Sequence, residues 1–184
     1  EKEETRVALF KALGRIGGEE SLSALTSLIE EVGMEGGPSE GEEAAIIQAL
    51  SRLAQNGNRD RKINKILTEY LDDKDGELRV LAAKGLAAYP SSTNLNLLLS
   101  SLRNEKEEAV KIELVKALNI SGNSQIINVY TTMYRDPSSS DALKKTLTEE
   151  IGKNPEGVRT VSLIQEGLAS PNDDIREATA EAFT

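Results

Sequence analysis

Apolar residues recur along this chain at the spacing of helices. One stretch carries Leu78, Ala82 and Leu86, each about one helical turn from the next. Turn-forming residues such as Gly17-Gly18 and Asn56-Gly57-Asn58 separate the apolar stretches. The same one-sided pattern returns in five more stretches: Leu22, Leu25, Leu28 and Ile29; Ile63, Ile66, Leu67 and Tyr70; Leu95, Leu98, Leu99 and Leu102; Ile126, Val129, Tyr130 and Met133; and Val161, Ile164 and Leu168. The pattern predicts an all-α chain.

The helical pattern itself repeats every 32 to 37 residues. The repeat is marked by a large apolar residue, usually after a small one: Ala12-Leu13, Ala49-Leu50, Gly85-Leu86, Ala117-Leu118, Glu150-Ile151 and Ala182-Phe183. We call the large residue the anchor. A small residue before it would let a neighbouring helix approach closely, and a period of this length is typical of helical solenoids. Each unit contains two helical stretches, so we expect five helix pairs and a final single helix.

Acidic residues stand ten or eleven positions before each anchor. These residues are Glu3, Glu40, Asp75, Glu108, Asp141 and Asp173. An acidic side chain there can cap the open N–H groups of a helix start and meet the positive end of the helix dipole. We therefore expect the first helix of each unit to begin at these positions.

The repeated outline resembles the HEAT repeat, in the short bacterial variety related to phycobilin-lyase repeats. The outline is clearest from Asp75-Gly76-Glu77-Leu78-Arg79 to Gly85-Leu86 and from Asp173 to Ala182. The resemblance implies a right-handed α-α superhelix, with first helices outside and second helices lining a concave face. We expect residues 1–184 to form a single array, cut from a longer chain, in which each repeat is stable only against its neighbours.

Cations stand seven positions before five of the six anchors, at Arg6, Arg79, Lys111, Lys144 and Arg176. They could be a ladder that binds phosphate. The resemblance implies instead that they pair with acidic residues of adjacent repeats, because interspersed charge on helices is usually a solvated, paired face.

One segment departs from the rhythm. Residues 32–43 are rich in glycine and acid, and residues 1–43 hold 11 acidic and 4 basic residues. We expect an acidic loop at 32–43, with residues 32–41 as the most mobile internal segment.

The composition excludes several classes of chemistry. The chain has neither cysteine nor histidine, so it lacks thiolate and imidazole metal ligands, cysteine nucleophiles and every triad with a histidine base. Asp73 and Asp75 suit positions three and five of an EF-hand loop, but Leu71 and Ala82 would stand at positions one and twelve. We therefore expect no metal, no cofactor and no catalytic site. The absence of cysteine is compatible with the cytoplasm or the bacterial periplasm.

Partners are constrained by charge and hydropathy. A net charge of -9 and the absence of tryptophan disfavour nucleic acid, which is bound through cations and stacking aromatics. No apolar run is long enough to span a bilayer. A protein or peptide partner remains.

The candidate binding residues are short polar side chains at matching offsets on the second helices. They are Ser27, Asn64, Thr68, Asn96, Ser100 and Thr131. Small side chains would leave a groove open while their polar groups bond a peptide. The alternative is that they are ordinary solvated positions.

We therefore predict a non-catalytic scaffold for protein–protein interaction that binds its partner along the concave face. The alternative function is an enzyme or enzyme subunit, such as a protein similar to a chromophore lyase. The alternative binding site is the acidic loop at 32–43.

Overall fold

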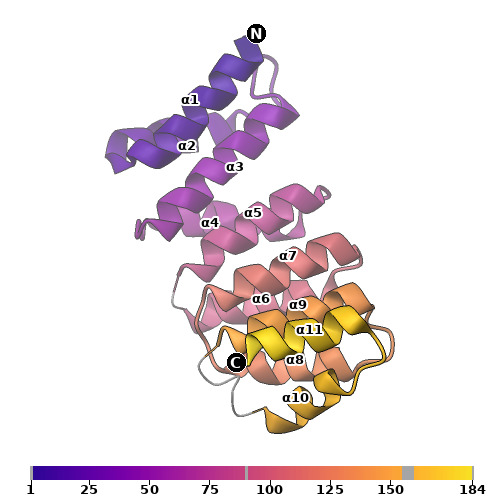
Figure 1. The fold of residues 1–184 in the computed structure, drawn as a ribbon. Coiled ribbons are helices and arrows are strands. Elements are labelled where there is room, and N and C mark those ends of the chain that lie inside the picture. Colours follow the sequence, from indigo (N-terminus) through magenta and orange to yellow (C-terminus); the bar gives the residue numbers. More distant parts are fainter. Residues whose placement is uncertain (1, 90, 155–159, 184) are drawn as a thin grey trace. The chain divides into compact units, whose positions relative to one another are not determined.

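The computed structural model describes residues 2–89, 91–154 and 160–183, and its regular elements there are all helical (Figure 1). The helices are α1 (Lys2–Ile16), α2 (Gly18–Glu30), α3 (Glu40–Gln55), α4 (Arg61–Glu69), the short 3-10 helix η1 (Tyr70–Asp72), α5 (Gly76–Ala87), α6 (Ser92–Asn104), α7 (Glu108–Asn119), α8 (Gln125–Arg135), α9 (Asp141–Gly152), α10 (Val161–Leu168) and α11 (Asp173–Ala182). The prediction of an all-α chain with five helix pairs and a final single helix is confirmed.

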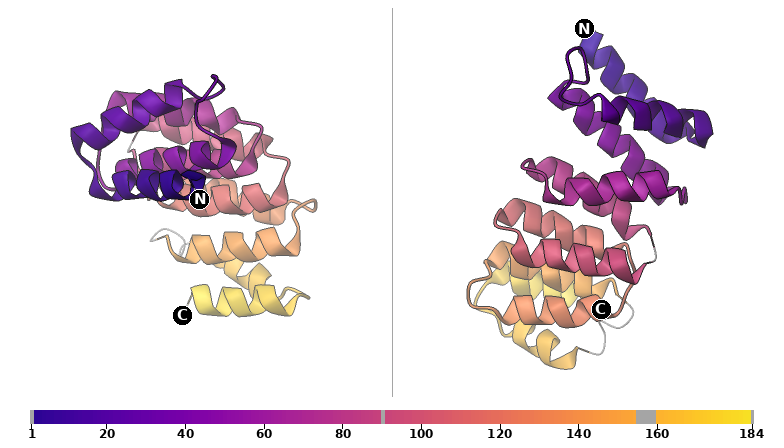
Figure 2. Two further views of the ribbon diagram at one scale, coloured as in Figure 1. Left: turned by 90° about the horizontal axis from the view of Figure 1, so that it is seen from above. Right: turned by 180° about the vertical axis from the view of Figure 1, so that it is seen from behind.

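The helices form two compact units, Glu1–Asn104 and Glu105–Thr184, called the N-terminal and C-terminal units below. In the N-terminal unit α1 packs on α3 and α3 on α5, and each second helix packs beside its own first helix (Figure 2). In the C-terminal unit α7 packs on α9 and α9 on α11, with α8 and α10 against this layer. Each unit is therefore a stack of helix pairs. A single array over residues 1–184 stays a prediction.

The anchors occupy the cores of these stacks. Leu50, Leu86, Leu118 and Ile151 are all completely buried. The first and last anchors are half-buried, because each lies on a helix with a neighbouring first helix on one side only. The repeat register deduced from the sequence is therefore the packing register.

Neighbouring first helices cross on very small residues. A Cβ atom added to Gly14 would lie 2.6 Å from the Ala49 Cα atom, and one added to Gly85 would lie 2.9 Å from the Ser51 Cα atom. In the C-terminal unit a Cβ atom on Gly152 would lie 2.6 Å from the Ala182 carbonyl oxygen. At each of these crossings the residue before one anchor thus meets the residue after the anchor of the preceding repeat.

The expectation about small residues is correct at Ala49, Gly85 and Ala182 but needs one correction. In the first repeat the close contact falls on Gly14, two positions after Ala12, and Ala12 is only half-buried. Helix α1 contacts a first helix on one side alone, so it uses only the residue after its anchor.

The first helices α3, α7, α9 and α11 begin at the acidic residues as expected, but most of these residues are not the caps. Asp75 caps α5, since its side chain accepts from the Glu77 N–H. Helices α3, α9 and α11 are capped one residue earlier by Ser39, Ser140 and Asn172. Glu40, Glu108, Asp141 and Asp173 lie in the first turn, where they still meet the helix dipole.

The same acidic residues also tie one repeat to the next. The Ser39 hydroxyl donates to Glu3 Oε1 at 2.6 Å, and the Asn172 amide donates to Asp141 Oδ2 at 2.8 Å. Ser140 makes the equivalent bond to Glu108. The capping residue of one first helix therefore binds the acidic residue that begins the preceding one.

The cations before the anchors follow no single rule. Arg6 pairs with Glu42 of the adjacent repeat at 3.1 Å, as expected. Arg79 donates to the carbonyl oxygens of Asp73 and Lys74, and Arg176 donates to the Ser170 carbonyl oxygen at 2.7 Å. These bonds fix the turn before each arginine's own helix. Arg176 pairs with Asp173 of its own repeat, so the expectation of pairing between repeats is wrong for Arg176.

The acidic loop is shorter than the sequence suggested. Helix α3 begins at Glu40, so residues 40–43 are helical. Glu42 is only 3% exposed and closes a capping box with Ser39. A side chain at Gly37 would collide with the Glu31 carbonyl oxygen, which explains the glycine there. The mobility of residues 32–41 stays a prediction.

Candidate interaction surfaces

The predicted binding residues differ in exposure although their offsets match. Ser27 on α2 and both Asn96 and Ser100 on α6 are exposed, whereas Asn64 and Thr68 on α4 are half-buried. The Thr68 hydroxyl donates to the Asn64 carbonyl oxygen at 2.9 Å, so part of its hydrogen-bonding capacity is used within the helix. The offset places polar residues on all three second helices of the N-terminal unit, and only part of the set is open to a ligand.

The C-terminal unit continues the series poorly. Thr131 on α8 is half-buried. On α10 the same offsets, counted from Val161, fall on Ser162 and Glu166. Arg135 of α8 contacts both residues: its Nη2 atom lies 2.6 Å from Glu166 Oε1 and donates to the Ser162 hydroxyl at 2.9 Å. Val161 is 58% exposed, whereas Leu163 is buried. The offset is therefore two residues out of register in α10.

A groove of about 420 Å³ separates the second helices α2 and α4. The half-buried side chains of Ile29 and Ile66 contribute apolar surface to it. Tyr70 lines the groove, and its hydroxyl donates to Glu43 Oε1 at 2.5 Å. Burial, followed by this bond to Glu43, raises the pKa of Tyr70 well above its ordinary value. The charged residues of the lining are of both signs: Glu30, Lys62, Lys65 and Glu69.

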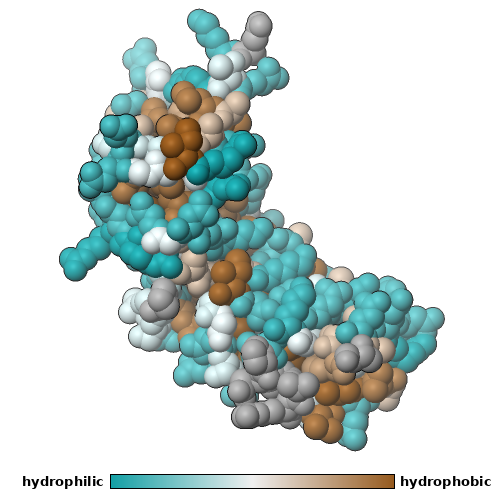
Figure 3. Space-filling view, turned by 60° about the vertical axis from the view of Figure 1, so that its left-hand side comes forward, coloured by the Kyte–Doolittle hydropathy of each residue, from teal (hydrophilic) through white to brown (hydrophobic). Residues whose placement is uncertain are grey.

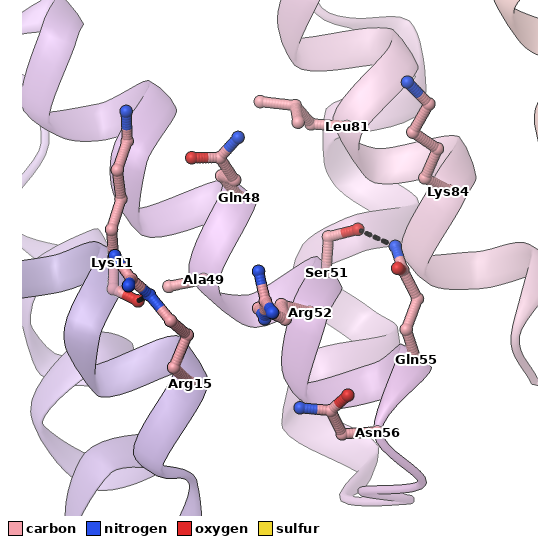
Figure 4. A pocket seen from close by; sticks show the side chains of 10 residues that line it. All are labelled: Lys11, Arg15, Gln48, Ala49, Ser51, Arg52, Gln55, Asn56, Leu81 and Lys84. Carbon is pink, nitrogen blue, oxygen red and sulfur yellow. Dashed lines mark hydrogen bonds between the residues drawn. The ribbon is translucent and has the colours of Figure 1, made fainter.

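A larger hollow of about 560 Å³ lies on the other side of the N-terminal unit, over the first helices α1, α3 and α5 (Figure 4). Its charged lining residues are all cations: Lys11, Arg15, Arg52 and Lys84. Uncharged amides of Gln48, Gln55 and Asn56 also line it. We call this site the basic hollow.

The basic hollow was not predicted from the sequence, although its cations stand beside the small residues of the helix crossings. Lys11 and Arg15 flank Gly14, Arg52 lies one turn after Ala49, and Lys84 precedes Gly85. These glycines and alanine are the points where the first helices cross. The cations are far apart along the chain because they come from three repeats. The crossing of α1, α3 and α5 brings them to one site.

On the face drawn in the space-filling view, apolar side chains form separate groups among polar ones (Figure 3). Across residues 2–89, 91–154 and 160–183, no three acidic side chains are grouped so as to hold a metal ion. None of the helices in these ranges combines the length and apolar character needed to cross a membrane.

Comparison with known proteins agrees with the repeat pattern. Residues 63–150 match the HEAT repeats family. No curated protein sequence matches the chain.

Two solved structures share the fold. One is an engineered protein, 15% identical, with a TM-score of 0.57 over 98% of this chain and 90% of that one. The other is the complex of CpcE and CpcF of phycocyanin lyase from Nostoc sp. PCC7120, 17% identical, with a TM-score of 0.59 over 96% of this chain and 69% of that one. At these identities the similarity shows the fold alone: an all-α solenoid of helix pairs.

Proposed function

We propose that this chain, whose residues 63–150 match the HEAT repeats family, is a non-catalytic scaffold that binds a protein or peptide along its second helices. The observation that carries the proposal is the groove between α2 and α4, with its apolar Ile29 and Ile66 and charged residues of both signs. Apolar side chains between charged ones suit a peptide that is partly apolar and partly charged.

None of the predicted second-helix residues is among the side chains that line this groove, although some of them lie on the helices that border it. Ser27 lies on one of the helices that border the groove, and Asn64 and Thr68 lie on the other. Short uncharged side chains lose little conformational entropy on binding and can bond a peptide backbone. Asn96 and Ser100 extend the polar surface to α6 of the same unit.

Catalysis is not part of the proposal. A chain without cysteine or histidine would have to rely on carboxylates, lysines or tyrosines for acid–base chemistry. The buried carboxylate of Glu42 is committed to the start of α3 and to Arg6. Incubation with a free bilin tests the lyase alternative directly, and we expect no bound chromophore absorbance.

Quantitative affinity capture tests the surface. The variant Ser27→Glu/Ser100→Glu adds two charges at exposed second-helix positions, and Ser92→Glu/Thr93→Glu adds the same charges at exposed positions in the first turn of α6. We expect proteins captured from an extract of the source organism to be lost with the first variant and kept with the second. Equal capture by both variants would show that Ser27 and Ser100 do not contact the partner.

The competing site needs a separate variant. Reversal of Glu42 or Glu43 would disturb the start of α3 and the bond to Tyr70, so the acidic loop is tested with Glu35→Lys/Glu40→Lys, both exposed. Loss of capture with this variant alone would place the binding site in the loop and overturn the second-helix proposal.

A further inference from the structure

The basic hollow is produced by the way the first helices cross. Gly14 against Ala49 and Gly85 against Ser51 bring α1, α3 and α5 close together. Side chains one turn from these crossings therefore surround one space. Figure 4 shows lining side chains from all three helices around it.

The charge of the hollow is opposite to that of its surroundings. Residues 1–43 hold 11 acidic residues and only 4 basic ones, yet two of those basic residues, Lys11 and Arg15, line the hollow. None of the ten lining residues is acidic. Throughout the described ranges, Lys11, Arg15 and Arg52 take part in no ion pair. Like charges on these three residues, with no ion-pair partner in the described ranges, favour an anion in the hollow.

We propose that the basic hollow binds a short acidic segment of a partner protein, through clustered anionic oxygens of glutamate, aspartate or a phosphorylated side chain. Arg15 and Arg52 are both exposed, and a guanidinium group can bond two oxygens of one carboxylate or phosphoryl group. Gln48 and Asn56 supply amides that can bond the peptide backbone. A volume of about 560 Å³ admits several side chains rather than one small ion.

Nucleic acid is a poorer occupant. No aromatic residue lines the hollow, so bases have no stacking platform. A long polyanion would also meet the acidic surface of a chain whose net charge is -9. The hollow suits an anion that is short enough to end where the cations end.

This site is independent of the second-helix groove. Its residues lie on α1, α3 and α5, whereas the groove lies between α2 and α4. The variant Ser27→Glu/Ser100→Glu should therefore leave binding at the basic hollow unchanged, and failure of one proposal does not decide the other.

Fluorescence anisotropy with three labelled peptides of equal length tests the proposal. One peptide carries a run of glutamates, the second a phosphoserine among serines, and the third glutamines only. The test variant is Arg15→Gln/Arg52→Gln. The control is Arg61→Gln/Arg103→Gln, which removes the same two charges at exposed positions on α4 and α6 of the same unit.

We expect the wild-type chain to bind an anionic peptide but not the neutral one, with affinity that falls as salt rises. The test variant should weaken binding about tenfold, and the control less than about twofold. The two anionic peptides identify the source of the oxygens, and preference for either supports the site. Should the test variant fail to melt cooperatively, Lys11→Gln/Arg52→Gln replaces it.

Three results would overturn the proposal. The first is equal binding of the anionic peptides by wild type and test variant. The second is an equal loss with the control variant, which would mean diffuse attraction to charge. The third is self-association in sedimentation velocity that both Arg15→Gln/Arg52→Gln and Glu35→Gln/Glu40→Gln abolish, because the occupant would then be the acidic loop of a second copy.

Discussion

The crossings of the N-terminal unit and one crossing of the C-terminal unit fill the same repeat position with opposite chemistry. In the N-terminal unit the residue after one anchor meets the residue before the next as Gly14 against Ala49 and as Ser51 against Gly85. In the C-terminal unit the equivalent pair of α7 and α9 is Asn119 and Glu150, joined by a hydrogen bond of 2.8 Å. A helix crossing can thus be secured by close van der Waals contact or by a polar pair.

The polar crossing in the C-terminal unit is supported by a second partner. Glu150 is only 4% exposed, and Lys153 donates to its other carboxylate oxygen at 2.6 Å. The buried Tyr130 hydroxyl donates to the Val115 carbonyl oxygen nearby in the same unit. Buried charge requires such partners because desolvation is otherwise unfavourable. Glu150 therefore replaces the small residue of the other crossings without leaving a buried charge unpaired.

The largest loss of stability is expected when a substitution breaks the close crossing of α1 and α3 in the N-terminal unit. In Gly14→Leu the new Cβ atom meets backbone atoms of Ala49, including Cα at 2.6 Å, so α1 must move away from α3. We expect a loss of unfolding free energy of about 3 kcal/mol or more, measured by urea denaturation. The control Arg15→Leu alters the adjacent exposed residue and should change stability by less than about 0.5 kcal/mol. A stable Gly14→Leu variant would show that the crossing is loose.

The next effect separates the polar crossing from the apolar one. Asn119→Ala leaves Glu150 with Lys153 as its bonded partner, and we expect a loss of about 2 kcal/mol because a buried carboxylate loses a hydrogen bond. In Asn119→Ala/Glu150→Ala the crossing becomes small against small, as at Gly14 and Ala49. The double variant should be no less stable than Asn119→Ala. Simple additivity of the two single losses would contradict coupling between the residues.

A third prediction uses alkaline pH. Burial, followed by the charge of Glu150, raises the pKa of Tyr130 well above its ordinary value. Above about pH 10, Tyr130 therefore ionises in the unfolded state but stays neutral in the folded state. The contribution of Tyr130 to the unfolding free energy is complete below about pH 10 and declines above it. At pH 11 the decline should reach about 1.4 kcal/mol, and Tyr130→Phe should remove that part of the pH dependence of stability.

Tyr70 gives the matched comparison in the N-terminal unit. Its pKa is also raised by burial and by Glu43, but the side chain is half-buried, so Tyr70→Phe should flatten the alkaline decline less than Tyr130→Phe. Identical pH profiles for wild type and Tyr130→Phe would mean that the Tyr130 hydroxyl ionises normally in the folded state.

The contrast between the units also shows which features the sequence carries. Anchors such as Leu86 and Leu118 were predictable because burial of large apolar residues leaves a periodic signal. The crossing at Gly14 was misplaced by two residues, since the end of an array lacks the second neighbour that defines the period. The Asn119–Glu150 bond was not predictable, because a buried polar pair is recognised only when both partners are placed.

The candidate sites divide in the same way. The polar binding residues of the second helices were predicted from equal offsets. The buried apolar positions do not begin at the same point in every helix, as the exposed Val161 shows. The basic hollow depends on how α1, α3 and α5 cross, and no single repeat contains enough of its cations to reveal it. The period of the sequence predicts the helices and the core residues of each repeat. A site formed by several repeats depends on how their helices cross.

The smallest expected effect concerns the bonds that tie a helix start to the preceding repeat in both units. Ser39→Ala removes the α3 cap and the bond to Glu3, and Asn172→Ala removes the α11 cap and the bond to Asp141. Each should lower the unfolding free energy by about 1 kcal/mol, the usual effect of losing a capping side chain. Ser39→Asp keeps a capping acceptor but sets a second carboxylate beside Glu3. If the bond between Ser39 and Glu3 stabilises the fold, Ser39→Asp should be no more stable than Ser39→Ala. If Ser39→Asp is as stable as wild type, the loss in Ser39→Ala comes from the missing cap alone.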